Sequence, residues 1–134
     1  MTTKPHDTDF TTAVQRSVAI RNLYHELEKR NHGGAWTNQE DMIGFVHDVG
    51  ELGKMVMAAE GRWLHPGDLG KDLQDKLSEC LWWIFTLSDR LGVDLTAAFS
   101  SKMAELEEDL STSLEHTDST ISHHAPAPSG TDRE

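Results

Sequence analysis

Carboxylates at helical spacing are the first feature of this chain that could carry chemistry. Asp48 and Glu51 are three residues apart, which on a helix places both side chains on one face, one turn apart. Asp72, Asp75 and Glu79 follow at offsets near whole turns, so they share a strip on a second helix. If the two helices pack antiparallel, the two acidic strips converge, and converging carboxylates repel one another unless a cation lies between them.

The chemistry available to such a group of carboxylates is the binding of a hard divalent cation. Mg²⁺ takes oxygen ligands, keeps several waters and readily bridges to phosphate oxygens. The spacing alone is also compatible with two solvated helix faces, which are the commoner outcome of such a pattern. Both interpretations remain open from the residues themselves.

Four helices are predicted to position these side chains. Apolar residues recur at three-to-five-residue steps from about residue 10 to residue 30, and a capping box, Thr37 to Glu40, opens the second helix. The third helix is expected from about residue 68 to residue 91, and Asp94 is a candidate cap for the fourth. The stripes expected to face a core are Met42, Phe45, Val46, Val49, Leu52 and Val56 on the second helix, and Leu69, Leu73, Leu77, Leu81, Ile84 and Leu91 on the third.

These elements predict an all-α fold, a protomer like a four-helix bundle that completes its core in a homodimer or a higher oligomer. We expect residues 1–9 to be a flexible N-terminus and residues 10–114 to form the all-α domain. Residues 115–134 are polar and acidic with few apolar side chains, which predicts a disordered tail.

Composition narrows the function classes. The chain has 134 residues, 12 basic and 23 acidic side chains and a net charge of −11, which disfavours DNA or RNA binding. Its longest apolar run, residues 81–85, is far shorter than the roughly 20 residues that span a bilayer. The single cysteine, Cys80, excludes a disulfide scaffold, and no apolar segment of a signal peptide opens the chain. We therefore expect a cytoplasmic protein without a membrane partner.

Three segments resemble the MazG-like, all-α nucleoside triphosphate pyrophosphohydrolases. They are Asp48–Lys54 (DVGELGK), Lys76–Trp82 (KLSECLW) and Leu91–Phe99 (LGVDLTAAF), and the resemblance spans about Trp36 to Leu110. It implies that the all-α domain is MazG-like. It also implies an enzyme that uses Mg²⁺, or Mn²⁺, to cleave a nucleoside triphosphate into the monophosphate and pyrophosphate.

The resemblance also implies which residues act. The family pairs Glu-x-x-Glu with a later Glu-x-x-Asp, and here the pairs fall on Asp48 and Glu51 and on Lys76 and Glu79. Asp48, Glu51 and Glu79 are thus the expected catalytic and metal-binding carboxylates. Trp83, one turn after Glu79, and Trp36 are the expected contacts to the base, while Lys54 and Lys76 would meet the phosphates. Ordinary packing or solvation remains the alternative for each of these four.

Lys76 is the departure from the family pattern, because a protonated ammonium cannot ligate a metal ion. Three consequences are open. Asp75 or Asp72, on the same strip, supplies the missing oxygen; or Lys76 contacts the phosphates directly; or hydrolysis is lost and a nucleotide-sensing or interaction module remains.

Overall fold

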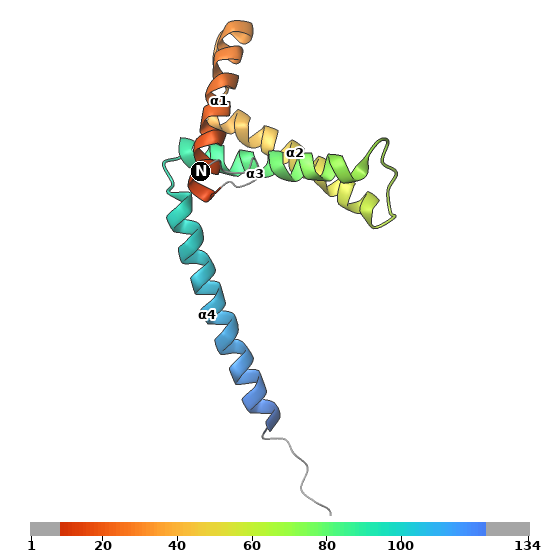
Figure 1. The fold of residues 1–134 in the computed structure, drawn as a ribbon, viewed down its shortest axis with the longest axis vertical. Coiled ribbons are helices and arrows are strands. Elements are labelled where there is room, and N and C mark those ends of the chain that lie inside the picture. Colours follow the sequence, from red (N-terminus) through yellow and green to blue (C-terminus); the bar gives the residue numbers. More distant parts are fainter. Residues whose placement is uncertain (1–8, 123–134) are drawn as a thin grey trace, which may run out of the picture. The chain divides into compact units, whose positions relative to one another are not determined.

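The computed structural model describes residues 9–122 and contains four helices there: α1 (Phe10–His32), α2 (Asn38–Ala59), α3 (Leu69–Arg90) and α4 (Leu95–Ser122) (Figure 1). None of the described residues is in a strand, so the prediction of an all-α helical bundle is confirmed. Within the same range no helix combines the length and the apolar character needed to cross a bilayer.

Local signals set the helix ends. The capping box is present at the start of α2, where Thr37 Oγ1 accepts from the Glu40 N–H at 3.2 Å and Glu40 Oε1 accepts from the Thr37 N–H at 3.2 Å. Asp68 caps α3 by accepting from the Lys71 N–H at 3.1 Å. Gly33 ends α1 with a φ of 78°, a left-handed conformation that glycine adopts without steric cost.

The chain divides into two compact units, residues 1–96 and residues 97–134. In the first unit, α2 and α3 run antiparallel along each other, and α1 crosses them and packs on α3 (Figure 1). Trp82 of α3 anchors this crossing by donating its Nε1–H to the carbonyl oxygen of Ser17 at 3.1 Å. Phe10 and Phe85 add an edge-to-face ring contact with centroids 5.3 Å apart.

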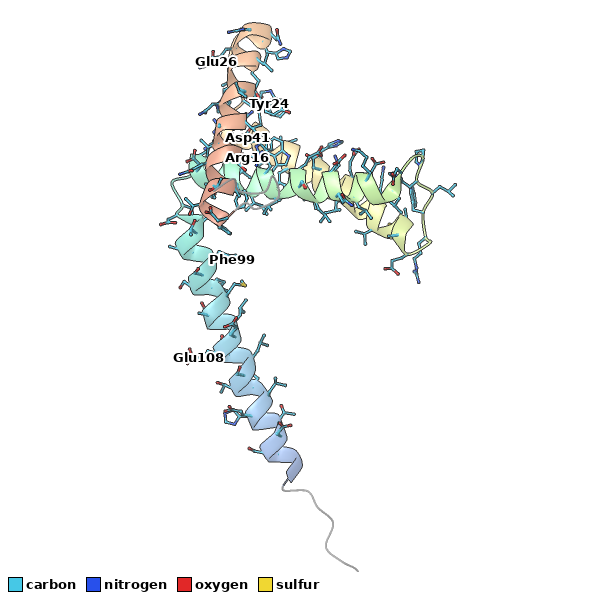
Figure 2. The ribbon with its side chains drawn as sticks, in the orientation of Figure 1. Arg16, Tyr24, Glu26, Asp41, Phe99 and Glu108 are labelled. Carbon is cyan, nitrogen blue, oxygen red and sulfur yellow. The ribbon has the colours of Figure 1, made fainter. Side chains whose placement is uncertain are left out.

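The second unit consists of α4 from residue 97 onward. Its side chains radiate around the whole helix (Figure 2), and those from 97 to 120 are exposed. The helix continues to Ser122, so the prediction that residues 115–134 are disordered is wrong for residues 115–122. Hydroxyl groups of Thr117, Ser119 and Thr120 donate to carbonyls four residues earlier and so fit the helix. Residues 123–134 of the predicted tail and residues 1–8 of the predicted flexible N-terminus lie outside the described residues.

The buried core is smaller than the sequence predicts. Among the described residues the buried hydrophobic side chains are Cys80, Trp83 and Phe85. The predicted core stripes are largely uncovered: Phe45, Leu52, Leu69 and Leu73 are half-buried, whereas Met42, Val46, Val49, Val56, Leu77, Leu81, Ile84 and Leu91 are exposed. Within the described residues the predicted stripes are therefore covered only in part, because α2 and α3 meet through faces that carry Gly44, Asp48 and Trp83.

Candidate functional site

An ammonium group at the centre of three carboxylates is the main feature of the α2–α3 contact. Lys76 Nζ lies 2.7 Å from Glu79 Oε2, 3.2 Å from Asp48 Oδ1 and 3.6 Å from Glu51 Oε2. α2 contributes Asp48 and Glu51, and α3 contributes Lys76 and Glu79. The four residues that the sequence singles out as two pairs thus meet at one point, and we call them the Lys76 cluster.

The charge of the Lys76 cluster is well defined. The hydrogen bond to Glu79, together with that to Asp48, raises the pKa of Lys76 far above its usual range although burial acts against this. The side chain of Lys76 is 14% exposed, whereas those of Glu51 and Glu79 are about half exposed. Because one cation faces three carboxylates, the cluster keeps a negative excess at its open side.

Trp83 connects the cluster to the interior. Its Nε1–H donates to Asp48 Oδ2 at 2.7 Å, so Asp48 is held by Trp83 through one oxygen and by Lys76 through the other. The ring lies directly on α2, because a Cβ placed on Gly44 would be 2.8 Å from Trp83 Cζ2. Gly44 is therefore the residue that lets Trp83 reach Asp48.

A pocket of about 630 Å³ opens beside the cluster, and Asp48 and Glu79 lie at its edge. Its walls are mostly apolar and come from α1, the segment around Trp36, and α3; the aromatic members are Tyr24, Trp36, Trp82 and Trp83. The rings of Trp82 and Trp83 are 4.8 Å apart between centroids, and those of Tyr24 and Trp82 are 5.6 Å apart. A flat apolar ligand fits the ring walls, while the negative rim favours a cationic end or an anionic end that a bound cation neutralises.

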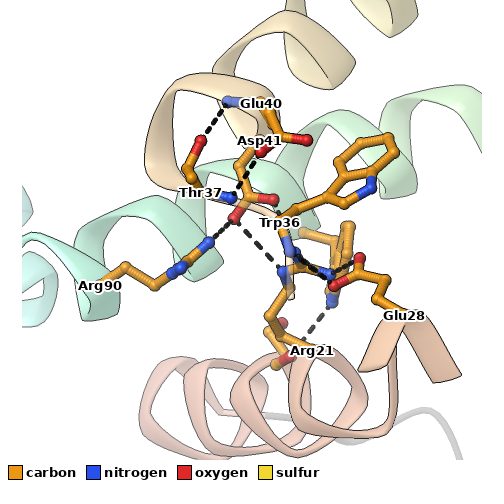
Figure 3. A network of polar contacts seen from close by, with 9 residues as sticks. Arg21, Glu28, Trp36, Thr37, Glu40, Asp41 and Arg90 are labelled. Carbon is orange, nitrogen blue, oxygen red and sulfur yellow. Dashed lines mark hydrogen bonds and ion pairs between the residues drawn. The ribbon is translucent and has the colours of Figure 1, made fainter. Parts of the chain in front are cut away.

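A buried ionic network shares Arg21, Glu28 and Trp36 with the lining of the pocket (Figure 3). Asp41 is fully buried and accepts from Arg21 Nη2 at 2.7 Å and from Arg90. Arg21 also pairs with Glu28 at 2.9 Å, and Glu28 accepts from the Trp36 N–H at 3.0 Å. The network thereby ties α1, α2 and α3 together and fixes the backbone of Trp36.

The sequence signals only part of this network. Arg21 and Glu28 are seven residues apart, two turns along α1, whereas Asp41 is 20 residues from Arg21 and 49 from Arg90, and no helical spacing connects these partners. The pKa of Glu28 also depends on the fold. Burial of the carboxyl group raises its pKa, but the hydrogen bonds from the Trp36 N–H and the Arg21 guanidinium outweigh burial, so the pKa lies below its usual value.

Three residues that the sequence analysis considered for the site lie outside the Lys76 cluster. Asp75, expected as a fourth oxygen ligand, pairs with Lys71 at 2.6 Å on the exposed side of α3, and its alternative, Asp72, bonds His65 Nε2 at 2.7 Å. Neither carboxylate joins the Lys76 cluster: Asp75 pairs with Lys71, and Asp72 contacts the His65 ring. Lys54 is exposed on α2 and is not part of the cluster either.

The Lys76 cluster is the position where a metal ion would have to bind. As the side chains lie, residues 9–122 contain no group of three or more His, Cys, Asp or Glu side chains arranged to hold a metal ion. The donor chemistry nevertheless suits Mg²⁺, since three carboxylates surround one position and a cation, the Lys76 ammonium, stands there. A divalent ion could take this position only after Lys76 moves out and the carboxylates close in.

Comparisons with known proteins add no relative: no protein-family model, no curated protein and no solved structure matches this chain.

Proposed function

We propose that this chain is a Mg²⁺-dependent pyrophosphohydrolase that cleaves a nucleoside triphosphate into the monophosphate and pyrophosphate. One observation carries the proposal: Asp48, Glu51 and Glu79 gather around the ammonium group of Lys76, beside an aromatic pocket. The resemblance of the surrounding segments to MazG-like pyrophosphohydrolases supports the same reaction. The chain would work as a homodimer or homotetramer in the cytoplasm, with the nucleotide as its ligand.

The residues have separate roles in this proposal. Asp48, Glu51 and Glu79 would hold Mg²⁺ or Mn²⁺, which when bound neutralises phosphate charge and lowers the pKa of a coordinated water. Trp83 keeps Asp48 oriented through the 2.7 Å hydrogen bond and is one of the residues that line the pocket. The base would lie between Trp36 and Trp83, where base–aromatic stacking is worth about 1–3 kcal/mol.

Lysines would complete phosphate binding. Lys76, once displaced from the three carboxylates, would meet the phosphates as a point charge; its partners Asp48 and Glu79 both line the pocket. Lys54 is exposed one turn beyond Glu51 on α2 and would approach the same groups.

A second candidate function is a catalytically degenerate module that senses nucleotides or binds a partner without hydrolysing anything. The specific observation that favours it is the occupancy of the cation position by Lys76, which is part of the chain and cannot dissociate. In this case the aromatic pocket still binds a nucleotide, and the Lys76 cluster serves as a fixed, metal-free end of the site.

Pyrophosphate release from a panel of ribo-, deoxyribo- and non-standard nucleoside triphosphates with Mg²⁺ tests the first proposal. We expect release by the unmodified chain and a loss of at least about a hundredfold in Glu51→Gln, since removing a transition-state charge contact costs this much or more. Glu108→Gln, on exposed α4, is the matched control and should retain full activity. Absence of release on the whole panel would reject the hydrolase.

Lys76→Glu separates the two candidate functions. If lysine blocks a latent site, the fourth carboxylate restores the family pattern and hydrolysis rises strongly. If lysine participates, hydrolysis falls while nucleotide binding, followed by calorimetry, is retained. Lys102→Glu, on an exposed turn of α4, is the matched charge reversal and should change neither quantity.

A further inference from the structure

Four aromatic side chains form a continuous wall along the pocket of about 630 Å³. The rings of Tyr24 and Trp82 are 5.6 Å apart between centroids, and those of Trp82 and Trp83 are 4.8 Å apart. Trp36 continues the wall, because a Cβ placed on Gly44 would lie within 3.5 Å of both the Trp36 and the Trp83 ring. We call Tyr24, Trp36, Trp82 and Trp83 the aromatic wall.

In the first unit these rings keep surface that a ligand can reach. Both ring pairs are tilted, with interplanar angles of 58° and 60°, rather than stacked face to face. Tyr24 is 50% exposed and Trp36 is 38% exposed. A ring face carries negative electrostatic potential, so it attracts an organic cation as well as a flat neutral ring.

Charge decides between these two kinds of ligand. Glu28, Asp48 and Glu79 line the pocket, and among its described lining residues Arg21 is the only lysine or arginine. The Arg21 guanidinium is buried and already pairs with Asp41 at 2.7 Å and with Glu28 at 2.9 Å (Figure 3). The described lining therefore offers a ligand carboxylates but no uncommitted guanidinium or ammonium group.

The Lys76 cluster adds to this negative charge. Its one ammonium group faces three carboxylates, so a negative excess remains beside Trp83. Asp48 also accepts the Trp83 Nε1–H at 2.7 Å, and a hydrogen bond to a carboxylate polarises the indole and increases the negative potential over its face. The net charge of −11 on the chain attracts cations from solution in addition.

Hydrogen bonding narrows the class of cation. Both oxygens of Asp48 already accept hydrogen bonds within the chain. Both oxygens of Glu28 accept from Arg21, and one of them also accepts from the Trp36 N–H. These carboxylates offer a ligand their charge more than unused acceptors. A primary ammonium ion would lose water from its N–H donors in such a pocket, whereas a quaternary ammonium ion has no donor to satisfy.

We propose that the aromatic wall binds an organic cation of the quaternary ammonium class, with the carboxylates of the pocket lining as counter-charge and without a metal ion. Tyrosine and tryptophan faces attract such a cation when it lies within about 6 Å of the ring centroid. The pocket volume lies in the range of small-molecule sites, about 300–1,000 Å³. The inference goes beyond the proposed hydrolysis and does not rest on it, because neither a metal ion nor a triphosphate takes part.

Calorimetric titration of the full chain with choline, in EDTA and at low salt, tests the inference. Choline should bind at least about tenfold more tightly than its neutral carbon isostere, in which a tert-butyl group replaces the trimethylammonium group, because only the charged form gains from the ring faces and carboxylates. Ethanolamine, the primary ammonium analogue, should bind more weakly than choline because its N–H donors lose their water.

Variants locate the bound cation. Tyr24→Leu removes a ring face and Glu79→Gln removes a counter-charge, and each should weaken choline binding about threefold or more, whereas Tyr24→Phe keeps the ring and should retain it. Trp63→Leu and Glu26→Gln are the matched controls, because both residues are exposed and neither lines the pocket. Choline binding that neither Tyr24→Leu nor Glu79→Gln weakens would lie outside the aromatic pocket and contradict the proposal.

Three results with the unmodified chain would overturn the inference, and they decide the question even if Tyr24→Leu does not fold. Equal affinities for choline and the isostere would show a site that responds to apolar shape alone. Ethanolamine that binds as tightly as choline would reject the quaternary class, and no saturable choline binding up to about 10 mM would reject the site. Because no nucleotide or metal ion is present, failure of the hydrolase proposal leaves these readouts unchanged.

Discussion

Asp48 is the most restrained carboxylate of the candidate site. Trp83 holds one of its oxygens at 2.7 Å and Lys76 holds the other at 3.2 Å, so its orientation is set before any ligand arrives. The resemblance implies that Asp48, Glu51 and Glu79 act together, whereas helical spacing alone also allows two solvated faces and includes Asp72 and Asp75, which have other partners. It does not predict that Lys76 fills the space between them, since the direction of a flexible side chain depends on the packed fold.

At the residue scale, Asp41→Asn should lower the free energy of unfolding by about 3–5 kcal/mol, the usual cost of breaking a buried ion pair. Asp41 is fully buried, and neutralising it leaves the charges of Arg21 and Arg90 without their shared partner. Urea denaturation followed by tryptophan fluorescence measures the change.

Asp75→Asn provides the control for this measurement. Asp75 and Lys71 form an exposed pair four residues apart, and because water screens such pairs they contribute little to the free energy of unfolding. If the two variants differ by less than about 1 kcal/mol, the network around Asp41 does not stabilise the fold as described.

Glu28 predicts a dependence of stability on pH. Its pKa is lower in the folded chain than in the unfolded one, so the folded state binds fewer protons in acid. The resulting stabilisation is present above the unfolded pKa, about 4.3, and is lost as the pH falls through the folded value. Glu28→Gln should therefore be less stable at neutral pH and show a flatter decline in acid, measured as urea midpoints from pH 7 to about pH 3.

Glu26→Gln is the matched variant for the pH series, because Glu26 lies on the same helix with an exposed side chain. Its acid profile should follow that of the unmodified protein. An equal flattening in both variants would show that Glu28 is not specifically stabilised by Arg21 and Trp36.

At the scale of the elements, helix starts are predictable from the sequence and helix partners are not. Thr37 and Glu40 mark the start of α2 by a local exchange of hydrogen bonds that needs no tertiary contact. The apolar stripe of α2, by contrast, shows that one face is apolar but not what covers it. The contact with α3 instead uses the side with Gly44 and Asp48, because Trp83 needs both a gap in α2 and an acceptor for its Nε1–H.

A matched pair of glycine variants tests this account of the α2–α3 contact. Gly44→Ala places a Cβ 2.8 Å from the Trp83 ring and should displace it, lowering stability and changing the near-ultraviolet signal of tryptophan. Gly50→Ala meets no atom within 4 Å and should stabilise α2 by about 0.5–1 kcal/mol through its higher helix propensity. Equal effects of the two variants would contradict the close approach of Trp83 to α2.

At the scale of the whole molecule, the all-α fold follows from helical periodicity, and the small core does not. The sequence already contains the aliphatic residues of a bundle, but within the described residues of the first unit Val49 and Leu81 remain about half exposed. The Asp41 network also escapes prediction, since Arg21 and Arg90 reach it only through the arrangement of three helices. Both features depend on long-range packing, which periodicity does not encode.

The central claim is that the Lys76 cluster and the aromatic pocket form one nucleotide site. A crystal structure of the full chain with Mn²⁺ and a non-hydrolysable nucleoside triphosphate tests it most directly. We predict the base between Trp36 and Trp83, and an anomalous manganese peak among Asp48, Glu51 and Glu79 with Lys76 turned toward the phosphates. A pocket without nucleotide, or phosphates bound away from these carboxylates, would contradict the account.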